Sequence, residues 1–164
     1  YAYLHAETLA PARREGRDGR WETQLNTENS PKSGPARNPF TVWPVPEALR
    51  SVYSHACEAQ AGARLLFVSG QFGVAPDGSL PDDFGGQCLQ AMANVESLLA
   101  DAGMTFSDVV KLTYYIVRAE DAPALGAARR DRWGSDAPPA VTMLVVSALA
   151  KPEYLVEIEA VAAG

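Results

Sequence analysis

Two glutamates near the C-terminus have the type and spacing of residues that do chemistry. Glu157 and Glu159 lie in the apolar, strand-like segment EYLVEIEAVA, residues 153–162. Because strand side chains alternate between faces, both carboxylates should point the same way, alongside Leu155 and Val161. Two acids on one side of an apolar strand indicate that this side meets a cation or takes part in a reaction.

Metal chemistry is not indicated by the other candidate ligands. The only histidines are His5 and His55, and neither has a second histidine or a cysteine at ligand spacing. Cys57 and Cys88 are too few for a disulfide scaffold, and Cys88 should sit on the apolar side of a helix. We therefore expect neither a metal nor a disulfide framework.

The charge distribution argues against nucleic acid as a partner. Residues 53–164 contain 7 Lys or Arg against 14 Asp or Glu, a net charge of −7, whereas residues 1–52 contain 7 against 6. An acidic body repels phosphate backbones, and only the arginines between positions 13 and 20 could reach one alone. No apolar run approaches the ~20 residues of a membrane span, and no secretory pattern opens the chain, so a cytoplasmic protein with no membrane association is expected.

The elements that must position the glutamates begin after a long polar segment. Residues 1–48 are rich in Pro, Gly, Asn, Ser and Arg and predict a loop-rich N-terminal extension, and residues 49–164 predict one domain. Lys32 or Arg37 of this extension could fold over a binding cleft.

Within the domain, hydrophobic periodicity predicts short strands and two helices. Two strands should precede the first helix, the second of them at 64–70. The first helix lies within 82–103, capped by Asp82 or Asp83 and ended by Gly103. A strand follows at 108–117, then a helix at 122–133 with Leu125, Ala128 and Trp133 inward and Arg129, Arg130 and Arg132 around it. Strands at 141–149 and 154–162 complete the order.

This order predicts an α+β fold in which both helices cover one face of a mixed sheet. The other face is left with surplus apolar surface, which predicts oligomerisation.

Several motifs in register resemble the Rid (YjgF-type) family of reactive-intermediate deaminases. They are LLFVSGQFGVAPDGSL, QCLQAMANVESLLADAGMTFSDVVKLTYYIV, a proline-led strand and the terminal VEIEAVA, within residues 53–162. The resemblance implies a chorismate-mutase-like subunit, three of which close into a homotrimeric barrel. It also implies a small-molecule ligand in a cleft at each subunit boundary.

The resemblance implies a set of site residues, and this sequence departs from the family pattern at three positions. Tyr53, Ser69 and Glu157 match the family's site tyrosine, serine and water-positioning glutamate, while Glu159 should be structural. Gly70 permits close approach of a ligand to the backbone. Val141 replaces the arginine that clamps the substrate carboxylate, Met143 replaces a frequent cysteine, and Gly126 replaces an asparagine. Arg129, one turn after Gly126, is a candidate substitute cation, or else a surface arginine.

Two functions remain open from the sequence. The first is an enzyme that hydrolyses an imine or enamine intermediate, without metal or organic cofactor, on a substrate that differs from ordinary 2-imino acids. Glu157 would activate water there, with a pKa raised by burial. The alternative is a non-catalytic trimeric metabolite-binding protein of the same fold, with a pocket lined by Val141 and Met143.

Overall fold

The computed structural model describes residues 45–164, and residues 1–44 lie outside the described part. The expected extension, including Lys32 and Arg37, therefore falls almost wholly outside it. A short 3-10 turn, η1 at Glu47–Leu49, spans the expected boundary between the extension and the domain. The division of the chain at this boundary stays a prediction.

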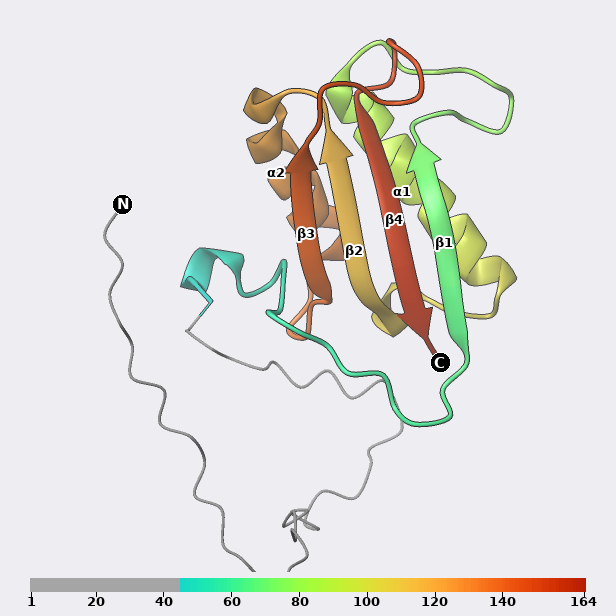
Figure 1. The fold of residues 1–164 in the computed structure, drawn as a ribbon, viewed down its shortest axis with the longest axis vertical. Helices are drawn as coiled ribbons and strands as arrows, with labels where there is room; N and C mark the ends of the chain where they lie inside the picture. The colour runs from blue at the N-terminus through green and yellow to red at the C-terminus, as the bar shows by residue number, and fades with distance from the viewer. Residues whose placement is uncertain (1–44) are drawn as a thin grey trace, which may run out of the picture. The chain divides into compact units, whose positions relative to one another are not determined.

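A four-stranded mixed sheet forms the centre of the described residues (Figure 1). Its strands are β1 at Leu65–Phe72, β2 at Val109–Ile116, β3 at Ala140–Val145 and β4 at Val156–Ala163. Their order across the sheet is β1-β4-β2-β3. β4 pairs antiparallel with both β1 and β2, while β2 and β3 run parallel. β1 and β3 are thus the two edge strands.

Two helices, α1 at Phe84–Asp101 and α2 at Ala122–Trp133, pack on the same face of this sheet (Figure 1). Asp83 caps α1, since its Oδ1 accepts a hydrogen bond from the Gly86 amide at 2.9 Å. Gly103 ends the helix with a φ of +70°. The predicted α+β fold, with two helices on one face of a mixed sheet, is confirmed. Among residues 45–164, neither helix is both long and apolar enough to cross a bilayer.

The core lies between the helices and this face of the sheet. In β2 the alternation is as predicted: Leu112, Tyr114 and Ile116 are buried, and the residues between them are half-buried. From α1 the core receives Cys88, Met92, Val95 and Leu99. Cys57 and Cys88 do not form a disulfide with each other.

One buried polar side chain fixes the entry into β4. Gln87 of α1 is 1% exposed, and its Nε2 donates to the carbonyls of Pro81 and Glu153, each at 2.9 Å. Its Oε1 accepts from the Leu155 amide at 2.9 Å. Because all these groups are paired, the loop before Glu157 is tied to the helix layer.

Two expectations need correction. Among residues 45–164, only β1 precedes α1 as a strand. The segment before β1 contributes a single bridge, from Ser54 to Ala140, because its hydrogen bonds go to the Pro138–Pro139 segment instead of a ladder. The inward stripe of α2 is also different, since its buried residues are Leu125, Arg129 and Trp133. Arg129 therefore occupies a core position that polarity alone had assigned to the outer surface.

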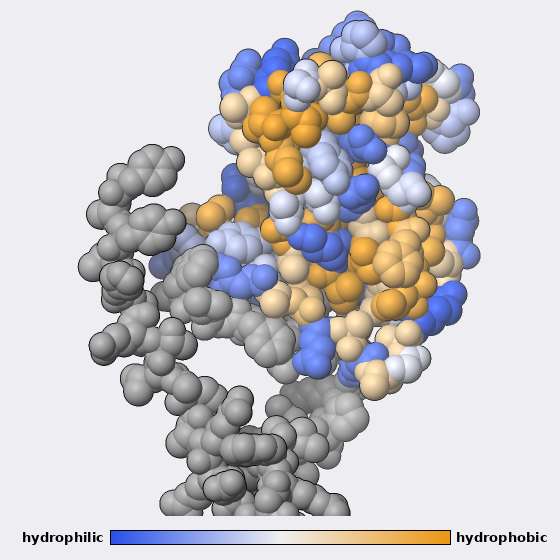
Figure 2. Space-filling view, viewed as in Figure 1, coloured by the Kyte–Doolittle hydropathy of each residue, from blue (hydrophilic) through white to orange (hydrophobic). Residues whose placement is uncertain are grey.

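The second face of the sheet carries no helix among the described residues. Phe67 and Leu65 of β1 are 72% and 49% exposed there, and Leu144 of β3 is 41% exposed. Figure 2, drawn from this side, shows the hydrophobic side chains separated by a band of hydrophilic ones. The predicted surplus apolar surface is therefore present.

Candidate functional site

A bulge in β1 brings Ser69 and Gly70 next to the two glutamates. Val68 pairs with Ala160 and Gln71 pairs with Ile158, so Ser69 and Gly70 together face the single residue Glu159. An extra residue on one strand bends it and re-aims its side chains, and such bulges recur beside active sites. The bulge thus places the predicted Ser69 opposite Glu159, and it brings the predicted Gly70 against the predicted Glu157.

Gly70 leaves space for the carboxylate of Glu157. A Cβ built on Gly70 would coincide with Glu157 Oε1, so any larger residue must displace that side chain. The Glu157 carboxyl is half-buried, and burial, followed by the negative charge of Glu159, raises its pKa. The direction is the one expected for a proton shuttle.

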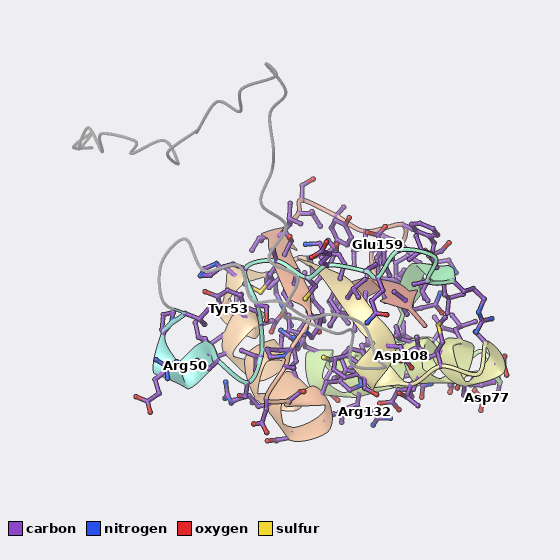
Figure 3. All side chains as sticks on the ribbon, turned by 90° about the horizontal axis from the view of Figure 1, so that it is seen from below. Arg50, Tyr53, Asp77, Asp108, Arg132 and Glu159 are labelled. Carbon is purple, nitrogen blue, oxygen red and sulfur yellow. The ribbon has the colours of Figure 1, made fainter. Side chains whose placement is uncertain are left out.

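Glu159 is held by a tyrosine that the sequence had not singled out. The hydroxyl of Tyr115 donates to Glu159 Oε2 at 2.9 Å, and this hydrogen bond raises the pKa of Tyr115. Figure 3 shows Glu159 on the uncovered side of the sheet and Arg132 on the helix side. A fixed hydrogen bond agrees with the structural role expected for Glu159.

A depression of about 290 Å³ opens beside this acid on the uncovered face. Its polar lining comes from Ser69, Lys111, Thr113 and Glu159. Lys111 Nζ donates to Thr142 Oγ1, and burial lowers the pKa of this lysine. The depression lies beside Ser69 and does not include Glu157 in its lining.

The remaining predicted residues lie at the opposite edge of the sheet. Tyr53 precedes Ser54, whose bridge to Ala140 and hydrogen bond to the Pro138 carbonyl (2.7 Å) fix this segment beside the start of β3. The Tyr53 ring meets His55 edge-on, with the ring centroids 5.5 Å apart. Val141 packs against the core, and Met143 is 46% exposed.

Gly126 and Arg129 come to this edge from α2. A Cβ on Gly126 would have only Arg130 Nη1 nearby, at 3.7 Å, so the position is open. Arg129 is 4% exposed, and its guanidinium lies 5.6 Å from the centroid of the Tyr114 ring. Its interpretation as a surface arginine is therefore wrong, because α2 turns position 129 toward the sheet.

The structure thus divides the predicted site into two groups. Ser69, Gly70 and Glu157 lie on β1 and β4, while Tyr53, Gly126, Arg129, Val141 and Met143 lie near β3 and α2. Three strand spacings of about 4.8 Å, or about 14 Å, separate the edge strands β1 and β3. Figure 3 shows Tyr53 and Glu159, a residue of β4, at separate places along the sheet. One copy of the described residues does not bring the two groups together.

Comparison with known proteins gives the family. Residues 46–164 match the family described as Endoribonuclease L-PSP. A RutC family protein of Pyrococcus horikoshii is 31% identical over 112 residues, which cover 67% of this chain and 85% of that protein. A RutC family protein of Aquifex aeolicus is 40% identical over 65 residues, 39% of this chain, and the match spans only half the length of that relative.

Solved structures that resemble this chain point to the same family. YyfB of Yersinia pestis, described as a protein of unknown function of the conserved Rid family, is 37% identical with a TM-score of 0.66, covering 77% of this chain and 95% of that one. RidA from a Psychrobacter species is 26% identical with a TM-score of 0.58, covering 70% and 94%. The chain belongs to the Rid (YjgF-type) family.

The close packing of Gly70 and Glu157 generates a test by double-mutant cycle. Gly70→Ala should lower the free energy of unfolding by about 1–3 kcal/mol, because the added methyl group displaces the carboxylate. The same change in a Glu157→Ala background should cost much less, since the obstructing group is gone. Denaturant unfolding of the four proteins measures the coupling. Equal costs in both backgrounds would contradict the contact.

Proposed function

We propose that the protein hydrolyses an imine or enamine intermediate in a site completed between subunits of a homotrimer. The observation that carries the proposal is the separation of the two groups of site residues, one on β1 and β4 and the other near β3 and α2. A second copy that places its β3 edge beside β1 of the first would unite them. The relative TdcF of Escherichia coli, described as a candidate reactive intermediate deaminase, supports the chemistry and is 33% identical over 58 residues.

The uncovered face supplies the physical reason for assembly. Phe67 is largely exposed on it, and β1 and β3 both leave one row of backbone groups unpaired within the described residues. Burying apolar area gains roughly 25 cal/mol per Å², and pairing or covering the edges removes two sites of aggregation. A closed ring of three copies meets both requirements.

Glu157 is the residue best placed to activate water in this site. Its pKa is raised toward neutral pH, which suits a residue that transfers protons. The β1 backbone packs against its carboxylate. Ser69 and the amides of the bulge would steady the negative charge that develops on the substrate. Tyr53 of the neighbouring copy would line the other side. No metal or organic cofactor is needed for this hydrolysis, and the cytoplasmic location stays part of the proposal.

The substrate would differ from the ordinary 2-imino acids of the family. Val141 and Met143 make the β3 side apolar where the family resemblance implies an arginine and a cysteine. The same apolar lining supports the second candidate, a trimeric protein that binds a small metabolite without catalysis. The two candidates differ in whether ammonia is released.

An ammonia-release assay on freshly generated imines separates the candidates. We expect the wild type to accelerate release at least about hundredfold over its Glu157→Gln variant, because the positioned carboxyl is lost in that variant. Val141→Arg serves as the comparison that reintroduces a cation on β3. Release by Val141→Arg alone would favour the binding protein, or a changed substrate.

The pH dependence should report Glu157. A general base must be deprotonated, so activity should fall as the pH drops through a pKa above the 4.5 of an ordinary glutamate. Because the charge of Glu159 contributes to the raised pKa, Glu159→Gln should move this acid limb to lower pH without removing it. Rate profiles of kcat/KM between pH 4 and 9 would check this. An acid limb unchanged in Glu159→Gln would contradict the assignment.

Assembly should depend on the uncovered face. Phe67→Asp places a charge on the surface that the proposed trimer buries, and we expect dissociation to monomers in analytical ultracentrifugation. Leu89→Asp is the matched control, because Leu89 is 48% exposed on α1, on the helix side of the molecule. It should leave the mass of the particle unchanged. A wild type that sediments as a monomer would overturn the interface site.

A further inference from the structure

Two nitrogens of the buried Arg129 guanidinium have no hydrogen-bond acceptor among residues 45–164. Arg129 is 4% exposed, and neither Nε nor Nη2 has a hydrogen-bond partner in this part of the chain. Its place on the inward stripe of α2, between Leu125 and Trp133, is one where a helix normally carries an apolar residue. The fold therefore keeps a guanidinium where a leucine or methionine would pack at lower cost.

The neighbours of Arg129 do not neutralise it. Cys88 and Tyr114 are the ionisable groups that face this region from α1 and β2. Burial raises the pKa of the Cys88 thiol to about 11, and burial also raises the pKa of the Tyr114 hydroxyl, so both are neutral at physiological pH. The contact with the Tyr114 ring is worth about 0.5–2 kcal/mol. An uncompensated buried charge costs several kcal/mol, so the ring alone does not offset it.

A second unpaired donor accompanies the guanidinium. The hydroxyl of Tyr114 is buried and has no hydrogen-bond partner among the described residues. Buried polar groups in proteins are almost always paired, and two neighbouring exceptions call for a common explanation. Two N–H groups of a guanidinium and one phenol O–H form a donor set suited to the oxygens of a carboxylate.

The donors lie on the side of the sheet that carries Val141 and Met143. Across β2 and β3, Leu112 is paired with Val141 and Tyr114 with Met143, so these side chains share the helix-covered face. The half-exposed, flexible Met143 thus adjoins the ring beneath Arg129. Helical side chains also lean toward the preceding turn, which places the arginine side chain toward the open position of Gly126.

We propose that Arg129 and Tyr114 together bind the carboxylate of a small organic acid, so that the ligand's anionic group is held from α2 and β2 instead of from β3. Arg129 and Tyr114 would thus be specificity residues of the proposed interface site. Their part in catalysis rests on the proposed function. The binding step itself requires no turnover. It is therefore measured separately from the deaminase reaction.

The test is a set of thermal unfolding measurements on the full chain with three carboxylates, namely acetate, pyruvate and benzoate. Acetamide and benzamide are the neutral analogues, and ionic strength is matched throughout. We expect at least one carboxylate to raise the Tm of the wild type, and the amides to leave it unchanged. Arg129→Met should weaken carboxylate binding by about ten- to hundredfold, as expected for the loss of charged hydrogen bonds.

Matched variants separate binding from a structural role. Arg130→Met changes the exposed neighbour on the same helix and should bind the carboxylate as the wild type does. Tyr114→Phe should bind it several-fold more weakly while unfolding at the same or a higher temperature, because it removes an unpaired hydroxyl. Without ligand, Arg129→Met should also unfold at the same or a higher temperature, since an unpaired buried charge is removed.

Three outcomes would overturn the assignment. One is a wild type that no carboxylate stabilises beyond the amides. Another is an Arg129→Met protein that retains the carboxylate effect. The last is an Arg129→Met protein that, without ligand, unfolds at a clearly lower temperature than the wild type, which would show that an acid of residues 1–44 or of a neighbouring copy already pairs with Arg129. Carboxylate binding without ammonia release would instead count only against the proposed catalytic function.

Discussion

The order of the strands is the constraint on which the arrangement of the candidate site depends. With β4 and β2 in the centre, Ser69 and Gly70 lie at one edge of the sheet and Val141 and Met143 at the other. Both helices are committed to the same face, so the described chain has no further element to cover the other face or to join the edges. Under the proposed function, a site built from both groups would need a second copy, so that assembly would be a condition of activity.

Much of the fold follows from the sequence, because periodicity reports burial directly. The alternation in residues 108–117 gave β2, and Asp83 and Gly103 marked the ends of α1 through capping and left-handed backbone chemistry. The strand predicted before residue 64 is wrong. The apolar pattern of this segment resembles a strand, but its hydrogen bonds go to the turn before β3. Whether a short segment finds a partner strand is a tertiary property that local pattern does not contain.

The site was less accessible to sequence reasoning, for physical reasons that differ by residue. Alternation and family resemblance name Glu157, Ser69 and Gly70 as site candidates, but the bulge that sets Ser69 and Gly70 against β4 depends on the register between two distant strands. For Arg129 the sequence leaves a substitute cation of the site and a surface arginine both open, and only packing shows that its spacing from Leu125 and Trp133 places it inward. The Tyr114 hydroxyl gave no signal, because tyrosine fits an apolar strand as well as a binding site.

In the proposed interface site, the charges of the two groups would act on each other. A carboxylate ligand held by Arg129 and Tyr114 of one copy would approach Glu157 of the next, whose pKa is already raised by burial and by Glu159. A further negative charge nearby disfavours the ionised form of Glu157 still more, so ligand binding would draw a proton onto this residue. Because water activation needs the ionised carboxylate, this linkage would raise the pH above which Glu157 can accept a proton from water. The proton that Glu157 gains in that step is then the one that the departing amine needs. The same electrostatics would make the bound anion and the proton on Glu157 thermodynamically linked, with each favouring the other.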